Sequence, residues 1–165
     1  SLGAGSINKA MVRWLEKIAG WKDVQVIWQC GSYYHKELEE QLKGRMPENV
    51  KFMPFLKRMD LAYACADLVV ARAGTISELC LLGKAVVLVP SPNVAEDHQT
   101  KNAMALVNKQ AAVMVKDAEV VERLGGVMER LLQDDGERKS LSEHILTLAM
   151  KDSDEVIARE ILKIM

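Results

Sequence analysis

The chain has 165 residues, enough for one domain with a hydrophobic core and short for two. Hydrophobic residues make up 49% of it and charged residues 27%, and 22 basic against 23 acidic side chains leave a net charge of −1. This balance excludes the net-basic surface typical of nucleic-acid binding, and aromatic residues, at 5%, are too few to supply stacking platforms for single-stranded bases.

Segments with helical and strand-like spacing alternate along the chain. Asn8–Ala19 has the spacing of a helix, with Met11, Trp14, Leu15 and Ile18 on one face. The next elements are predicted, in chain order, as strand Val24–Gln29, helix His35–Leu42, strand Val50–Met53, helix Met59–Ala66, strand Leu68–Ala71, helix Thr75–Leu82, strand Ala85–Val89, helix Asp97–Asn108 and strand Ala112–Val115. Three helices with no strand between them are predicted to follow, at Ala118–Gln133, Glu137–Met150 and Ser153–Ile164.

This alternation determines the expected fold class. Strands that alternate with helices form βαβ crossovers, and these build a parallel sheet with helices on both faces. The near-continuous apolar runs Leu68–Ala71 and Val86–Val89 fit strands that are buried on both sides. The predicted class is therefore α/β, a Rossmann-like, doubly wound parallel sheet.

Cysteines and short motifs give little sign of redox or metal chemistry. Cys30, Cys65 and Cys80 are an odd number without Cys-x-x-Cys spacing, which predicts small apolar residues of a reduced, cytosolic protein. No apolar run approaches the ~18 residues of a membrane span. Gly-x-Ser-x-Gly and the Walker lysine loop are absent, and the opening loop is not a full Gly-x-Gly-x-x-Gly. We expect a soluble, intracellular domain that holds no metal and no cofactor.

The glycine-rich segment Ser1–Ser6 is the first candidate for ligand binding, because ligands of open parallel sheets bind on the loops that open the helices. Its small residues allow a backbone to approach a phosphate at a helix N-terminus, although a plain helix-opening turn fits equally well. A turn of this kind normally follows a strand. We therefore expect an opening strand, or a whole preceding domain, in the same protein.

The loop Arg72–Glu78, after the third predicted strand, is the second candidate. Gly74 permits a tight turn, and Thr75 can cap the following helix. Glu78 lies in the first turn of that helix, where a carboxylate can accept hydrogen bonds from two vicinal hydroxyls such as those of a ribose. The alternative role for Glu78 is that of a capping-box glutamate.

The loop Pro90–Asn102, stiffened by two prolines, is the third candidate. His98, Gln99 and Asn102 fall within about one turn of a helix start, so they can face one ligand, and amides with a donor and an acceptor suit sugar hydroxyls. The alternative is a solvated helix N-terminus with Asp97 as its cap.

The loop Pro54–Met59 is the fourth candidate. Phe55 and Leu56 could flank a flat ring while exposed backbone groups bind the edge of the ring. The alternative is that the two side chains fill the core.

Taken together, these loops carry a specific resemblance to a known family. Over essentially all 165 residues the chain resembles the C-terminal, donor-binding half of the MurG family of glycosyltransferases, whose members add N-acetylglucosamine to the lipid-linked muramyl-pentapeptide precursor of peptidoglycan. The resemblance is strongest in Ser1–Asn8, in Arg72–Leu79 and in Val89–Ala103. One departure is the turn between Gly74 and Thr75, which is about two residues shorter than the family motif.

The resemblance implies a two-domain GT-B architecture in which this half, as a single domain over residues 1–165, holds UDP-N-acetylglucosamine. Ser1, Gly3 and Ala4 would face the diphosphate, beside Gly74 and with a contact from Thr75. Phe55 and Leu56 would lie around the uracil, and Glu78 would bind the ribose hydroxyls. His98, Gln99 and Asn102 would lie near the N-acetylglucosamine.

The resemblance also implies what lies outside this half. A preceding N-terminal domain would bind the lipid-linked acceptor, supply the general base and associate with the cytoplasmic face of the inner membrane; His98 is the competing candidate for the base. The chain alone would bind the donor without transferring the sugar. Other GT-B UDP-sugar transferases, a UDP-N-acetylglucosamine 2-epimerase and a non-catalytic nucleotide-sugar-binding module stay open as alternatives.

Overall fold

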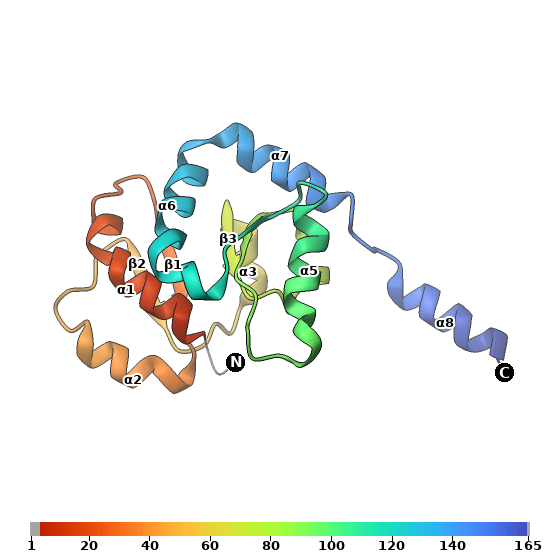
Figure 1. The fold of residues 1–165 in the computed structure, drawn as a ribbon, viewed down its shortest axis with the longest axis horizontal. Coiled ribbons are helices and arrows are strands. Elements are labelled where there is room, and N and C mark those ends of the chain that lie inside the picture. Colours follow the sequence, from red (N-terminus) through yellow and green to blue (C-terminus); the bar gives the residue numbers. More distant parts are fainter. Residues whose placement is uncertain (1–3, 165) are drawn as a thin grey trace.

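The computed structural model of the chain describes residues 4–164 and contains the alternating elements that the sequence predicts (Figure 1). The helices are α1 (Gly5–Ala19), α2 (Ser32–Gln41), α3 (Met59–Cys65), α4 (Ile76–Leu82), α5 (His98–Val107), α6 (Val120–Gln133), α7 (Asp135–Leu146) and α8 (Ser153–Ile164), with short 3₁₀ turns η1 (Ala95–Asp97) and η2 (Asp117–Glu119). The strands are β1 (Val26–Gln29), β2 (Val50–Met53), β3 (Leu68–Ala71), β4 (Ala85–Leu88) and β5 (Val113–Met114). The predicted run of three C-terminal helices is confirmed.

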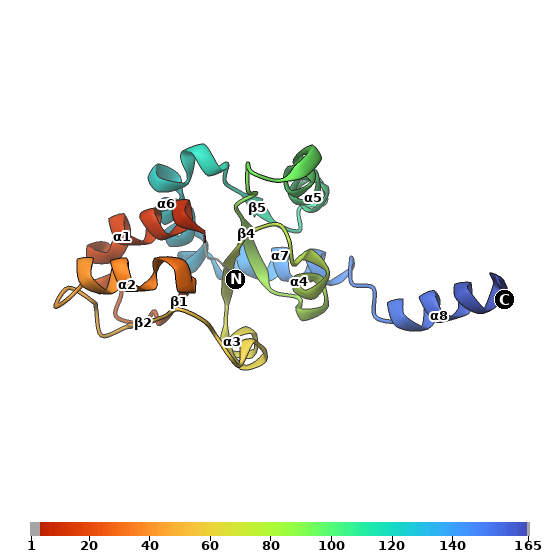
Figure 2. The ribbon, with the colours of Figure 1, turned by 90° about the horizontal axis from the view of Figure 1, so that it is seen from below.

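All strand pairs are parallel, which confirms the predicted fold class. β1 pairs with β2, Val26 opposite Val50, and β3, β4 and β5 form a second sheet in that order, with Leu68 opposite Ala85 and Val87 opposite Val113. Within residues 4–164 no ladder joins β1 to β3, so the strands form two groups rather than one continuous sheet (Figure 2).

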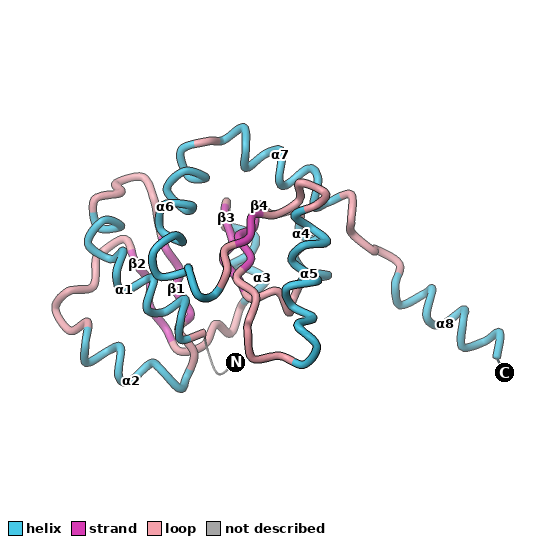
Figure 3. Tube along the Cα trace, in the orientation of Figure 1, coloured by secondary structure: helices cyan, strands magenta, loops and turns pink. Residues whose placement is uncertain are grey.

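The central strand β4 shows why helices must cover both faces of its sheet. All four of its residues are buried. Val87 packs into a core with α1 and α6, whereas Val86 and Leu88 pack into a second core with α4 and α5. Successive side chains of a strand point to opposite faces, so β4 contributes to a separate core on each side. This is the doubly wound arrangement, and Figure 3 shows the helices distributed around the strands.

A buried polar side chain fastens α1 to β1. Asn8 is 4% exposed. Its Nδ2 donates to the backbone oxygen of Cys30 at 2.9 Å, and its Oδ1 accepts from Trp28 Nε1 at 3.0 Å. Because a buried amide is costly unless its polar atoms are bonded, these bonds fix the position of the first turns of α1 relative to the carboxyl end of β1.

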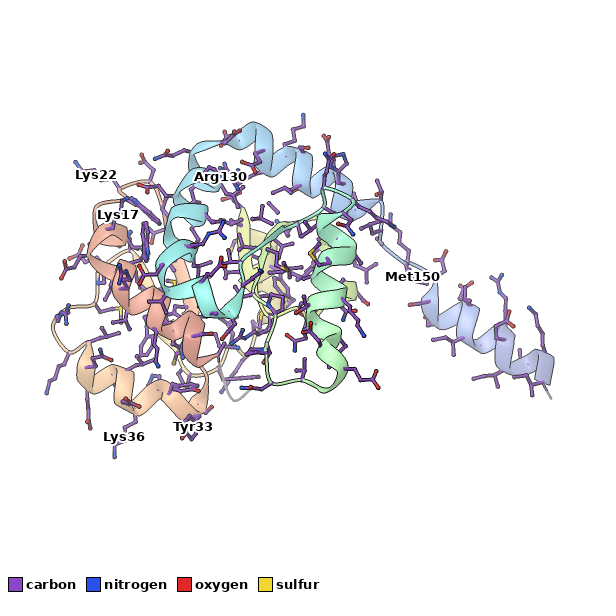
Figure 4. All side chains as sticks on the ribbon, viewed as in Figure 1. Lys17, Lys22, Tyr33, Lys36, Arg130 and Met150 are labelled. Carbon is purple, nitrogen blue, oxygen red and sulfur yellow. The ribbon has the colours of Figure 1, made fainter. Side chains whose placement is uncertain are left out.

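Helix α8 stands apart from the rest of the molecule, at the end of an extended linker that contains Met150 (Figures 1 and 4). All of its described residues are exposed, including Val156, Ile157, Ile161 and Leu162. Among the described residues, no helix combines the length and the apolar character needed to cross a bilayer.

The three cysteines are free thiols that differ in exposure. Cys30 and Cys80 are buried, and burial raises the pKa of both thiols, whereas Cys65, at the end of α3, is exposed. Since the thiolate is the reactive form, we expect a disulfide reagent such as Ellman's to label one thiol rapidly in the native chain and three after denaturation. Cys65→Ala removes the rapid phase. Rapid labelling that persists in Cys65→Ala would contradict this assignment.

Candidate functional site

A polar pocket of about 360 Å³ opens beyond the carboxyl ends of β3 and β4. Its walls come from the start of α1, from α2, and from the loops that follow β3, β4 and β5. The lining residues are Ala4, Gly5, Ser6, Tyr34, Arg72, Ser91, Pro92, Asn93, Gln99 and Asp117. This is the edge of a parallel sheet at which ligands are expected to bind.

The N-terminus of α1 is available to an anion at the rim of this pocket. Its N-cap residue, Ala4, has no side-chain capping bond, and the first turn holds no acidic residue. The first N–H groups of a helix lack partners within the helix, and the helix dipole favours negative charge there. Of the residues predicted to face a diphosphate, Ala4 lines the pocket; Ser1 and Gly3 lie outside the described residues.

Tyr34 explains why α1 begins with a glycine. A Cβ at Gly5 would lie 2.8 Å from the hydroxyl oxygen of Tyr34, closer than side-chain carbons pack. Tyr34 therefore borders the pocket directly against the backbone of α1. Sequence reasoning did not identify Tyr34, because nothing in the local pattern of α2 relates it to residue 5.

The loop from β4 to α5 is held by the amides that were predicted to bind sugar. Gln99 Oε1 accepts from the backbone nitrogen of Ser91 at 2.9 Å, and Asn102 Nδ2 lies 3.5 Å from the backbone oxygen of Ala73. Gln99 lines the pocket, whereas His98 and Asn102 are exposed beside it. Gln99 and Asn102 thus have a structural role in addition to any contact with a ligand.

In the alternative role of this loop Asp97 caps α5; it occupies the N-cap position but does not bond the helix with its side chain. Asp97 has a φ of 52° and makes no side-chain capping bond. Glu96, directly before it, has a φ of 54°. Two consecutive non-glycine residues in the left-handed region are rare, and such strain is typical of functional loops.

The β3–α4 loop exposes Gly74 and Thr75 to solvent, and Glu78 is exposed in the first turn of α4. Gly74 does not adopt a left-handed conformation, and the nearest side-chain atom to its Cβ position is Gln99 Nε2 at 3.9 Å. Thr75 does not cap α4 with its side chain, contrary to expectation. Burial raises the pKa of the Tyr63 phenol, the carboxylate of Glu78 raises it further, and the nearby Thr75 side chain lowers it.

The β2–α3 loop exposes Phe55, which is 53% accessible, so it does not fill the core. The backbone N–H of Leu56 donates to Gln29 Oε1 at 2.8 Å. This N–H is therefore already bonded and is not available to the edge of a ring that stacks on Phe55. Gln29 is an additional neighbour of such a ring, and sequence reasoning did not identify it.

The predicted residues thus form two groups. Ala4 and Gln99 line the pocket, with Gly74 close to Gln99, while Phe55, Leu56 and Thr75 on loops and Glu78 in the first turn of α4 are not among its lining residues. Within residues 4–164 no three side chains of metal-binding type cluster together.

Comparisons with known proteins agree with this architecture. Residues 1–157 match the family described as Glycosyltransferase family 28 C-terminal domain. The chain is 52% identical to a protein of Bacteroides fragilis, over 99% of this chain and 44% of the relative, and 51% identical to one of Bacteroides thetaiotaomicron, over 99% and 45%. Both relatives are named UDP-N-acetylglucosamine--N-acetylmuramyl-(pentapeptide) pyrophosphoryl-undecaprenol N-acetylglucosamine transferase. The chain spans less than half the length of these curated relatives.

A solved structure extends the comparison to the fold. The crystal structure of Acinetobacter baumannii MurG superposes with a TM-score of 0.83 and 26% identity, over 99% of this chain and 47% of that one. The resemblance predicted from the loop motifs is confirmed. The chain belongs to the glycosyltransferase family 28 C-terminal domain family.

Proposed function

We propose that this chain is the UDP-N-acetylglucosamine-binding half of an inverting glycosyltransferase that adds N-acetylglucosamine to the lipid-linked muramyl-pentapeptide of peptidoglycan synthesis. The observation that carries the proposal is the 52% identity, over 99% of the chain, to a relative named for this reaction.

In this proposal the donor lies across the carboxyl edge of both strand groups. The uncapped N-terminus of α1 holds the diphosphate beside Ala4, and the exposed carboxylate of Glu78 accepts the two ribose hydroxyls. Phe55 and Leu56 flank the uracil. His98, Gln99 and Asn102 contact the N-acetylglucosamine.

The chemistry follows from this arrangement. The C4 hydroxyl of the acceptor attacks the anomeric carbon from the face opposite UDP, the bond to the diphosphate breaks, and the configuration inverts. The helix N-terminus stabilises the charge that develops on the departing UDP. The base that accepts the hydroxyl proton belongs to an N-terminal acceptor domain of the same protein, which also carries association with the cytoplasmic face of the membrane.

The break between β1 and β3 supports the proposal that a further strand, from a preceding segment of the polypeptide, lies between them. Ile27 on β1 is 46% exposed, and all four residues of β3 are only half-buried although those of β4 are buried. A strand between them would precede α1 in a right-handed βαβ unit. In a longer chain that includes this segment, backbone amides of β3 should exchange hydrogen more slowly than in the 165-residue chain; equal rates would argue against the insertion.

Calorimetric titration of the chain with UDP-N-acetylglucosamine and with UDP-glucose tests the proposal. We expect saturable binding that prefers the N-acetylated sugar, and no transfer to a lipid-linked acceptor by this half alone. Equal affinity for the two donors would favour another UDP-sugar transferase. Conversion of the donor without an acceptor would favour a 2-epimerase, and absence of binding at millimolar donor would contradict the proposal.

A further inference from the structure

Arg72 joins three segments of the chain at the floor of the pocket. Its Nη1 lies 3.1 Å from the backbone oxygens of both Val89 and Pro90, at the end of β4. The same nitrogen donates to Asp117 Oδ1 at 2.5 Å, in the turn after β5. Its Nη2 donates to Ser6 Oγ at 2.9 Å, in the first turn of α1.

The network is closed by a bond that does not involve Arg72. The hydroxyl of Ser6 donates to Asp117 Oδ1 at 2.5 Å while it accepts from Arg72, so its hydrogen and a lone pair are both used. The side chains of Arg72 and Asp117 are 25% and 22% exposed, which shields the ion pair from most of the surrounding water. Charge-assisted bonds in such surroundings are stronger and more directional than those at an open surface.

The segments joined by Arg72 are the ones that form the pocket. Ser6 fixes the N-terminus of α1, and the two carbonyls fix the start of the β4–α5 loop, whose Ser91 is bonded by Gln99 of α5. A change at Arg72 therefore alters the position of the α1 N–H groups relative to Gln99 without removing either of them.

We propose that Arg72 is a positioning residue for the diphosphate end of the donor: the Ser6–Arg72–Asp117 network holds the N-terminus of α1 against the β4–α5 loop. This inference rests on the proposed function for its ligand. Arg72 acts through α1 and the β4–α5 loop and not by direct contact with the phosphates. Its Nη1 is occupied by two carbonyls and a carboxylate, and its positive charge is already balanced by Asp117.

The chain offers a matched control for this role. Arg138 also bonds two backbone oxygens, those of Leu131 and Leu132, and one carboxylate, that of Asp135, and its side chain is 18% exposed. It holds the corner between α6 and α7, which lies away from the start of α1 in Figure 1. Arg72→Gln and Arg138→Gln remove the same kinds of bond from two different places.

The experiment measures the affinity of both variants for UDP and for uridine, together with their melting temperatures. We expect both variants to lose similar thermal stability. Arg72→Gln alone should bind UDP roughly ten- to a hundred-fold more weakly, as the loss of bonds to a charged group implies. Uridine, which lacks both phosphates, should bind equally to the unsubstituted chain and to both variants in an NMR titration. A third variant, Arg72→Lys, should bind UDP as weakly as Arg72→Gln, because an ammonium cannot span the same acceptors.

A second readout needs no ligand. Hydrogen exchange at the amide of Asn8, whose bond to the backbone oxygen of Ala4 closes the first turn of α1, should accelerate in Arg72→Gln and remain unchanged in Arg138→Gln. Failure of the unsubstituted chain to bind UDP overturns the proposed function. UDP binding that is equal in the two variants, or unchanged exchange in Arg72→Gln, overturns the positioning role alone.

Discussion

Gly125→Ala is expected to lower the free energy of unfolding by about 2–3 kcal/mol, the range of an overpacked core site. A Cβ at Gly125 would lie 1.6 Å from Cε2 and 1.7 Å from Cδ2 of Trp14, so the indole ring of α1 lies directly on the backbone of α6. A methyl group there must displace the ring and separate the two helices. For a chain of this length the melting temperature should fall by about 5–10 °C.

Gly126→Ala is the matched control, one residue further along the same helix. No atom outside the helix backbone lies within 4 Å of a Cβ at Gly126, so the added methyl meets open space. Alanine is favoured over glycine in a helix by about 0.5–1 kcal/mol, and this variant should be more stable than the unsubstituted chain. Thermal or urea denaturation monitored by circular dichroism measures both changes. Equal stability of Gly125→Ala and Gly126→Ala would show that Trp14 does not press on α6.

The order and type of the elements could be predicted because their signals are local. The apolar face of α1 and the continuous apolar run of β4 repeat at the periods of a helix and a strand, and both elements bury those residues. The sequence left alternatives open where a local signal has two outcomes. Asp97 precedes a helix, as a cap does, but its left-handed backbone carries its side chain away from that role.

The site could be predicted only in part, because its geometry depends on distant residues. Gly5 and Tyr34 are 29 positions apart, and Ser6 and Asp117 are 111 apart. No spacing rule relates such positions. The motifs therefore identified the helix starts that carry Gln99 and Glu78, but the contacts of Arg72 with α1 and with the turn after β5 required the fold.

Glu78→Ala is expected to weaken UDP binding by roughly ten- to a hundred-fold, because it removes a charged acceptor of two hydrogen bonds. In the structure the carboxylate of Glu78 is exposed at the first turn of α4, where it can accept hydrogen bonds from a diol. Its negative charge contributes to the raised pKa of the Tyr63 phenol. Isothermal titration of the variant with UDP measures the loss.

The decisive control changes the ligand instead of the protein. 2′,3′-Dideoxy-UDP lacks both hydroxyls, so it should bind to the unsubstituted chain more weakly than UDP does. The Glu78→Ala variant and the unsubstituted chain should bind this analogue with equal affinity. Glu143→Ala, which removes an exposed helical carboxylate of α7, should leave both affinities unchanged. An equal loss of UDP and dideoxy-UDP affinity in Glu78→Ala would mean that Glu78 supports the fold of the loop. A loss confined to UDP assigns the carboxylate to the ribose, because the effect of the substitution then requires the hydroxyls that it is proposed to bind.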